Sequence, residues 1–243
     1  MDMVFKEKVL SLHRKFFDGS ELPIVFYYTE RCPEEYRAQP VRCLIEGMSE
    51  VRKGKSLCFY EGAIACAGGK RFLGFSEQFG PGIEQFLSRV EHIKKTPELA
   101  GDMVKNVSGF KAPAGFIIFK RWDMLEESDR PEVVIYFARV DLLSALYTLA
   151  NYDEHDGAIA PSGSGCSSIV LNPYLERGSE HPRAIIGMLD VSARPFVPED
   201  VLTFAVPMER FVTMVDNMEG SFLGTKTWQA VQARINSSAK NMP

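Results

Sequence analysis

The chain has 243 residues, of which 45% are hydrophobic and 25% are charged, and its formal net charge is −4 at pH 7. This length allows a sizeable buried core, and this composition excludes a largely disordered chain. The acidic balance offers no basic face, so we expect neither nucleic acid nor a membrane as a partner.

The first half of the chain mixes helical and strand patterns. Apolar spacing predicts a helix over 5–17, and an aromatic and β-branched run predicts a strand over 23–28. A helix opened by Pro40 is expected over 41–53, followed by a strand over 57–60. Residues 61–82 contain six glycines, which indicate a loop with sharp turns. Two amphipathic helices are predicted over 83–93 and 97–105.

The second half holds the clearest buried strands, over 115–119 and 132–137, and the charged turn 126–130 is expected to link them as neighbours. Asp141 is predicted to cap a helix that ends at Ala150. Further strands are expected over 158–160, 183–188 and 201–206, and further helices over 166–171, 208–218 and 228–235. The irregular alternation predicts an α/β or α+β fold with a mixed sheet of about six to seven strands and helices packed on it. We expect a single domain over 1–243, with a frayed polar tail over 237–243.

The cysteines and the N-terminal residues together predict a cytoplasmic location. The N-terminus is charged and has no apolar segment typical of a secretory signal, and no apolar run reaches the roughly 20 residues of a membrane span. Five cysteines without an export signal argue against disulfides. Cys58 is expected to pack in the core, and Cys32 to lie in a loop without a role.

The segment 162–166, Ser-Gly-Ser-Gly-Cys, carries the most chemical information. Two glycines let successive backbone N–H groups point inward, and a helix that starts there adds partial positive charge. Such a turn binds anions, and it favours the thiolate of Cys166 as a nucleophile or metal ligand. A capped strand-to-helix turn without a ligand is an equally good interpretation.

A second segment of this kind is Cys-Ala-Gly-Gly-Lys-Arg at 66–71. Its glycines allow close approach, and its two cations suit a carboxylate or phosphate, although a surface turn with solvated cations also explains them. Together the two segments predict a ligand-binding cleft formed by Gly68, Gly69, Lys70, Arg71, Ser162, Gly163, Ser164, Gly165 and Cys166. The loop 151–156 offers Asp153, His155 and Asp156 as oxygen and imidazole ligands, but at no known metal-ligand spacing.

The positions of several cysteines and glycines carry a family resemblance. Arg42-Cys43-Leu44, Gly54, the segment 64–69 and Leu73-Gly74-Phe75 are followed by Ser162-Gly163 with Cys166, by Asp190 with Arg194, and by Phe204-Ala205-Val206-Pro207. Over nearly the whole chain this pattern resembles the domain of unknown function 169 family, whose members are cysteine-bearing bacterial and archaeal proteins. The resemblance implies a shared fold and supplies no established activity.

The resemblance also implies a metal site, because many family members bring four cysteines together, as a zinc ion or an iron–sulfur cluster requires. Cys43, Cys66 and Cys166 match three of the four. The fourth cysteine is absent, and near Asp190 this chain has Gly187 and Met188 instead.

Three functions follow as hypotheses, in order of preference. The first is a protein that binds a small anionic molecule or cofactor in the cleft of the two Cys/Gly-rich segments. The second is an iron–sulfur or zinc protein that uses Cys43, Cys66 and Cys166. The third is a cysteine-dependent enzyme with Cys166 as nucleophile and His155 or His181 as base. The sequence does not decide whether the protein is an enzyme, nor its oligomeric state.

Overall fold

The computed structural model describes residues 1–155 and 157–240. These residues form an α/β fold with one mixed sheet, as predicted. Its strands are β1 (Ile24–Thr29), β2 (Leu57–Phe59), β3 (Phe116–Arg121), β4 (Val133–Arg139), β5 (Ile159–Pro161), β6 (Ala184–Gly187) and β7 (Val201–Pro207). Its α-helices are α1 (Met3–Phe16), α2 (Leu44–Arg52), α3 (Ala67–Phe72), α4 (Ile83–Gln85), α5 (Pro97–Lys105), α6 (Val140–Ala150), α7 (Asn172–Leu175), α8 (Met208–Asn217) and α9 (Lys226–Lys240). Two π-helical segments, η3 (Phe86–Val90) and η5 (Ser167–Leu171), continue α4 and precede α7.

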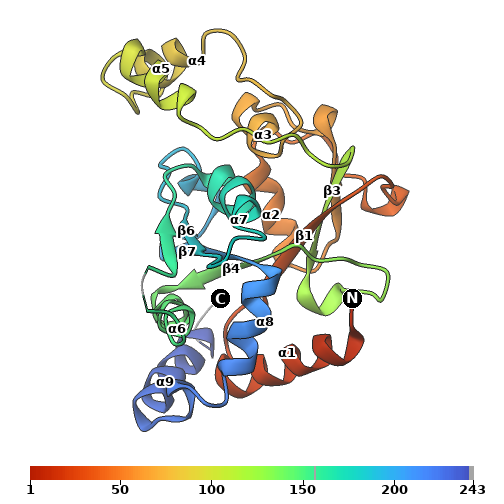
Figure 1. The fold of residues 1–243 in the computed structure, drawn as a ribbon, viewed down its shortest axis with the longest axis vertical. Coiled ribbons are helices and arrows are strands. Elements are labelled where there is room, and N and C mark those ends of the chain that lie inside the picture. The colour runs from red at the N-terminus through yellow and green to blue at the C-terminus, as the bar shows by residue number, and fades with distance from the viewer. Residues whose placement is uncertain (156, 241–243) are drawn as a thin grey trace.

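The seven strands lie in the order β2-β3-β1-β4-β7-β6-β5, and Figure 1 labels β3, β1, β4, β7 and β6. All neighbouring pairs are antiparallel except β5 and β6, which run parallel at one edge. The long pairing of β4 with β7, from Val133–Pro207 to Arg139–Val201, forms the centre of the sheet.

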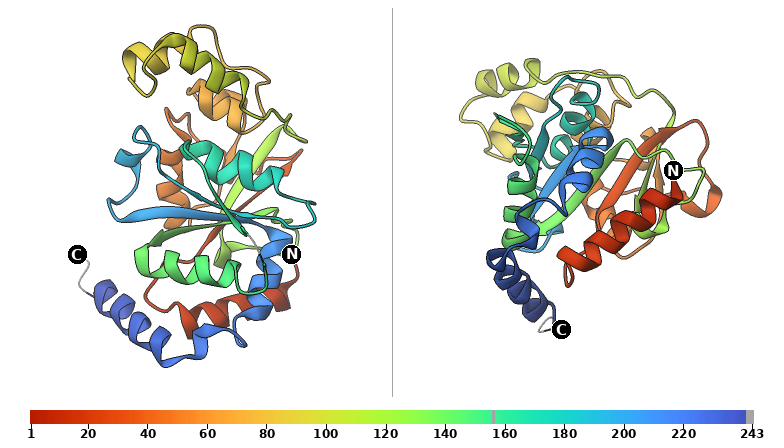
Figure 2. Two further views of the ribbon diagram at one scale, coloured as in Figure 1. Left: turned by 60° about the vertical axis from the view of Figure 1, so that its left-hand side comes forward. Right: turned by 60° about the horizontal axis from the view of Figure 1, so that its bottom comes forward.

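Helices cover both faces of the sheet, as the edge-on view in Figure 2 shows. Side chains alternate across a strand, so Val134 and Tyr136 of β4 join one core, and Ile135 and Phe137 join the other. The first core is completed by α1, α6, α8 and α9, and the second by α2 and η5. Because β4 is buried on both faces, its sequence is a continuous apolar run.

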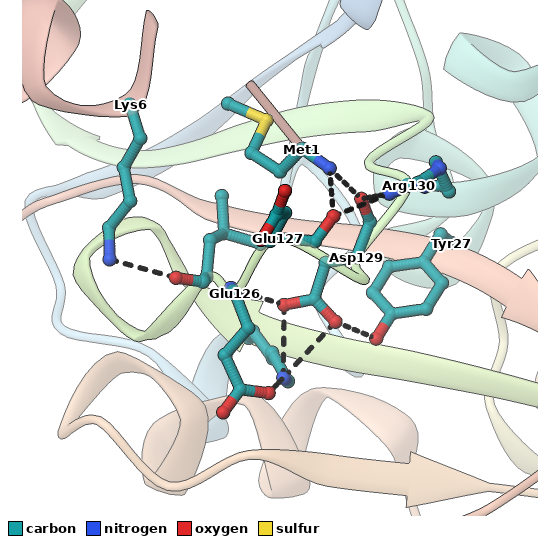
Figure 3. Close-up of polar contacts among 9 residues, drawn as sticks. Met1, Lys6, Tyr27, Glu126, Glu127, Asp129 and Arg130 are labelled. Atoms are coloured by element: carbon teal, nitrogen blue, oxygen red, sulfur yellow. Dashed lines mark hydrogen bonds and ion pairs between the residues drawn. The ribbon is translucent and has the colours of Figure 1, made fainter. Parts of the chain in front are cut away.

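The turn at 126–130 was predicted to link neighbouring strands, and this prediction is wrong. The turn connects β3 to β4, and β1 lies between them in the sheet. Figure 3 shows the polar cluster that fixes this turn. Asp129 is buried, accepts a hydrogen bond from the Tyr27 hydroxyl, and pairs with the Lys120 ammonium at 3.0 Å. The amino group of Met1 donates to the carbonyls of Glu127 and Asp129 at 2.7 and 2.5 Å. This cluster holds the crossing turn against β1 and is a structural element.

Residues between α3 and β3 form a lobe of α4, η3 and α5 that projects from the sheet in both Figures 1 and 2. Thr96 caps α5 through a bond from the N–H of Leu99, and Pro97 occupies its first turn, so this helix matches its prediction. The lobe exposes Phe86, Val90 and Leu99.

Several helix boundaries differ from the prediction. The helix predicted over 41–53 starts at Leu44, after Cys43, and the predicted glycine loop over 61–82 contains the short helix α3. Arg139, not Asp141, is the N-cap of α6, since Asp141 already lies within the first turn and its carboxylate binds Arg234. Of the predicted frayed tail, 237–240 belong to α9, and 241–243 lie outside the described residues. Across the described part of the chain, no helix combines the length and the apolar character needed to cross a bilayer.

One disulfide corrects the expectation that the cysteines stay unpaired. Cys32 and Cys58 are bonded, with Cα atoms 6.0 Å apart. Backbone pairing explains their meeting, because Arg37 forms a parallel bridge with Cys58, and the N–H of Ala38 donates to the Cys58 carbonyl. The segment that follows Cys32 therefore runs alongside β2. Cys43, Cys66 and Cys166 are free thiols.

Candidate functional site

A short parallel pairing brings together the two loops that carry Cys43 and Cys66. Val41 and Ile64 form a parallel bridge, fixed by the N–H groups of Val41 and Ala65. Since parallel chains advance together, the residues two positions beyond the bridge, Cys43 and Cys66, occupy matching places. Each is also the N-cap residue of the helix that follows, α2 or α3.

Cys166 interacts with Cys43 although it follows β5, which lies at the opposite edge of the sheet from β2. The N–H of Ser162 donates to the Ile186 carbonyl beside β5 and β6, and the chain then turns into a helix at Gly165. The N–H of Gly165 donates to the Asp190 carboxylate at 3.4 Å. A Cβ on Gly165 would lie 2.8 Å from that of Ala193, so glycine is required for this close packing.

Among the three free cysteines, Cys43 has a lowered pKa. A hydrogen bond from the Cys166 thiol is the main cause that lowers the pKa of Cys43, to about 6. The backbone N–H groups of Ile45 and Glu46, in the first turn of α2, lower the pKa of Cys43 further, against the opposing effect of burial. Cys43 is therefore mostly thiolate at neutral pH, as cysteines at helix N-termini often are.

Cys166 behaves in the opposite way. Its hydrogen bond to Cys43, its burial and the nearby charges of Cys43, Cys66 and Asp190 all raise the pKa of its thiol well above the ordinary value. Cys166 is buried, Cys43 is half-buried and Cys66 is exposed. The two interacting cysteines thus differ in character, because the pKa is raised for the buried Cys166 and lowered for the half-buried Cys43.

The place of the missing fourth cysteine is taken by apolar packing. Met188 is fully buried, with a backbone φ of 63° that non-glycine residues seldom adopt. Its sulfur would lie 3.7 Å from a Cβ on Gly165, directly before Cys166. The adjacent Gly187 lets η5 approach β6, because a Cβ there would lie 2.0 Å from the side chain of Ser168.

The residues of the predicted cleft differ in their surroundings and in their burial. Gly69 faces Ile64, where a Cβ would lie 2.8 Å from its methyl group, whereas Gly163 has open space around it. Arg71 is buried: its Nη2 donates to the Val107 carbonyl at 3.4 Å, and its guanidinium lies 5.8 Å from the Phe79 ring centroid. Its Nη1 has no partner among the described residues. Ser162 is buried, and Ser164 accepts a helix bond from the N–H of Ser168.

Lys70 lines an open hollow of about 400 Å³ on the outer side of α3. Ala65 and Ala67, on either side of Cys66, belong to the same wall, and Glu61 is also part of it. The predicted cation Lys70 thus lines this hollow, whereas Cys66 is not part of its wall and its sulfur would lie 3.6 Å from a Cβ on Gly68. Glu61 had no motif to mark it in the sequence, because it joins the site through the fold alone.

The residues present do not complete a metal centre. Within 1–155 and 157–240, no three or more His, Cys, Asp or Glu side chains gather as metal ligands would. The predicted set Cys43, Cys66 and Cys166 lacks a fourth protein donor, so the metal alternative stays a prediction. In the loop 151–156, the carboxylate of Asp153 binds Arg210 at 2.5 Å, and Asp156 lies outside the described residues.

The candidate bases for Cys166 have other surroundings. His181 is exposed, and its Nδ1 lies 3.4 Å from the Glu154 carboxylate. His155 is exposed in the loop that precedes β5. Neither has a contact with Cys166 among the interactions of the described residues, and the group that raises the pKa of Cys166 most is Cys43.

Comparison with known proteins finds one family. The domain of unknown function 169 family, described as an uncharacterised ArCR, matches residues 15–217, which include all three free cysteines and all seven strands of the sheet. No curated protein and no solved structure matches the chain. Because the match covers most of its length, the chain belongs to the domain of unknown function 169 family.

Proposed function

We propose that this protein carries out thiol–disulfide exchange, with Cys43 as the attacking thiolate and Cys166 as the resolving thiol. The proposal is carried by the interaction between the buried Cys166 and the half-buried Cys43, which lowers the pKa of Cys43 to about 6 and raises the pKa of Cys166. An acidic outer cysteine paired with a protonated inner one is the arrangement that such exchange needs. The same argument favours Cys43 over Cys166 as the nucleophile of a cysteine-dependent enzyme.

The proposed reaction consumes a small-molecule disulfide. The Cys43 thiolate attacks one sulfur, the disulfide bond breaks, and one thiolate leaves and takes up a proton from water. Cys166 then gives its proton to water and attacks the Cys43 sulfur, which expels the second thiolate. The two cysteines lose two electrons and become a disulfide, while the small molecule becomes two thiols.

Alkylation with iodoacetamide over a range of pH, read by peptide mass spectrometry, tests the thiolate. We expect the rate at Cys43 to rise with a midpoint at about pH 6. In Cys166→Ala the midpoint moves upward, because the side chain that contributes most to the low pKa of Cys43 is removed. Cys66→Ala, which leaves Cys166 in place, is the matched control and keeps the low midpoint.

Hydroxyethyl disulfide, a neutral substrate, tests the exchange itself. The unmodified chain should give a Cys43–Cys166 disulfide, and Cys166→Ala should stop at a mixed disulfide on Cys43. A Cys43 that titrates near the ordinary cysteine value, or a chain that forms no adduct with this reagent, would overturn the proposal.

The anion-binding cleft, the preferred hypothesis from the sequence, is compatible with this function, because a substrate must be held beside the thiols. The metal hypothesis makes a different prediction, which is bound iron or zinc in the protein purified without oxygen. Metal analysis of that preparation separates the two.

A further inference from the structure

We propose that the Cys32–Cys58 disulfide is a redox-controlled latch, which fixes the segment 32–42 alongside β2 and thereby positions Cys43. Reduction of the disulfide releases the segment and slows the reaction of the thiol site. This inference rests on the proposed function, because it names how the same site is regulated. The disulfide stands at one end of the segment, and Cys43 directly follows the other end.

The segment 32–42 is held on the molecule by few side chains. The structure describes the whole segment, and Ala38 is its only buried residue. The Tyr36 ring packs beside the disulfide, and the Lys120 ammonium lies 4.8 Å from its centroid. A segment that buries so little apolar surface gains little stability from packing. Its place on β2 therefore depends strongly on the covalent bond at its start.

A short backbone pairing leads from the disulfide toward the thiol site. The N–H of Ala38 donates to the carbonyl of Cys58 at 3.0 Å, and the N–H of Val41 donates to the carbonyl of Ala63 at 2.9 Å. Cys43 lies two positions beyond Val41, in the extended conformation of the residue that caps α2. Because the pairing begins at a disulfide cysteine, opening the disulfide removes the first fixed point of the chain that carries Cys43.

The switching step is the reduction of the disulfide by a dithiol. Cys32 is half-buried and Cys58 is fully buried, so the thiolate of the dithiol attacks the Cys32 sulfur. The bond between the two cysteines breaks, and Cys58 leaves as a thiolate and takes up a proton from water. The second thiol of the reagent gives its proton to water and attacks the reagent sulfur bound to Cys32, which leaves and is protonated in turn. Two electrons pass to the cysteines, and the dithiol becomes a cyclic disulfide.

Three samples test the latch: the unmodified chain with its disulfide, the same chain reduced with dithiothreitol and freed of the reagent without oxygen, and Cys32→Ser. Amide hydrogen exchange over 32–42, followed by mass spectrometry, measures release of the segment. We expect exchange there to be about tenfold faster in the reduced chain and in Cys32→Ser, with β4 unchanged. Cys66→Ala, which removes a cysteine outside the latch, is the matched control and should exchange like the unmodified chain.

Reaction with hydroxyethyl disulfide measures the effect on the thiol site in the same samples. The Cys43–Cys166 disulfide should form about threefold more slowly in the reduced chain and in Cys32→Ser, because a released segment no longer positions Cys43 against Cys166. The reduced chain keeps the comparison valid if the serine variant folds poorly, since its sequence is unchanged.

Equal exchange over 32–42 in all three samples contradicts the latch and overturns the inference. A Cys43–Cys166 disulfide that forms equally fast in all of them overturns it as well, because the segment then has no influence on the site. If the unmodified chain does not react with hydroxyethyl disulfide, the proposed function has failed instead. Exchange over 32–42 still decides in that case whether the disulfide holds the segment, so the two failures are distinguishable.

Discussion

His13 shows how a single buried residue couples this fold to pH. It lies on α1 in contact with the edge of the Phe17 ring, and its Nε2 is 3.2 Å from the Glu21 carbonyl. Burial is the main cause that lowers the pKa of His13 to about 4, with a smaller opposing effect from the bond to Glu21. The imidazole is therefore neutral in the folded protein at pH values where it is already protonated in the unfolded chain.

The sign of the resulting pH dependence follows from that difference. An unfolded histidine binds its proton below about pH 6.5, so between 6.5 and 4 the unfolded state binds more protons than the folded state. Stability is fully present above this window and falls as the pH is lowered, by about 3 kcal/mol from this residue. Urea unfolding at pH 7 and pH 4 should show that loss.

A glutamine at position 13 keeps an amide donor for the Glu21 carbonyl but does not titrate. His13→Gln should therefore lower stability at pH 7 and flatten its fall toward pH 4. His155→Gln, a change of an exposed histidine, should leave the slope as it is. Equal slopes for the His13 variant and the unmodified chain would contradict the assignment.

At the scale of elements, the contact between β6 and η5 depends on Gly187. A methyl group there would lie 2.0 Å from both Cβ and Oγ of Ser168, and 2.9 Å from the Thr203 hydroxyl. We expect Gly187→Ala to destabilise the protein by about 3 kcal/mol, the upper end for an overpacked core. Because η5 follows Cys166, the variant should also move the pKa of Cys43 upward.

Thermal unfolding and the alkylation midpoint of Cys43 measure the two effects. Gly163→Ala, where nothing lies within 4 Å, is the matched control and should change neither. Adding Ser168→Gly to Gly187→Ala removes the clashing atoms and should restore part of the lost stability. A Gly187→Ala protein as stable as the control would show that β6 and η5 are not this close.

Many of the helices and strands could be predicted from the sequence, but the cysteine site could not. The strands β1, β3, β4 and β7 are runs of branched and aromatic residues because they are buried on both faces, and α1, α5 and α8 have clear apolar stripes. The cysteine site is different. Cys43 and Cys66 meet through a bridge between two irregular loops, and Cys32 meets Cys58 in the same way. Such pairings leave no periodicity, so only the family resemblance indicated that Cys43 belongs with the other two.

For the whole molecule, the order of the strands is what the sequence could not supply. Placing β1 between β3 and β4 depends on contacts between segments about a hundred residues apart, such as Ile24 with Arg121 and Ile135. The order brings the segments that carry Cys43, Cys66 and Cys166 to one side of the sheet, with α2 and η5 in the same core. The mixed character of the sheet was predicted, but the location of the site follows only from this order.

The lobe of α4, η3 and α5 is the part of the molecule that depends least on the sheet. Ser88 and Ala100 are its buried side chains among residues 83–105, whereas Phe86, Val90 and Leu99 are exposed. Its two arms meet at Arg71, whose guanidinium contacts Phe79 of the first arm and the Val107 carbonyl of the second. Helices that bury so little apolar surface open at low free energy, because packing supplies most of a helix's stability.

We therefore expect amide hydrogen exchange over residues 83–105 to be at least about a hundredfold faster than in β4 and β7, as a difference of about 3 kcal/mol in opening free energy implies. Exchange followed by mass spectrometry of peptides measures both regions in one experiment. Arg71→Met removes the polar clamp while keeping a long apolar side chain, and should speed exchange at 76–82 and 106–112 without affecting β4. Equal protection of the lobe and the central strands would contradict this prediction. It would mean that the lobe unfolds only together with the sheet, and that the contacts of Arg71 couple the two.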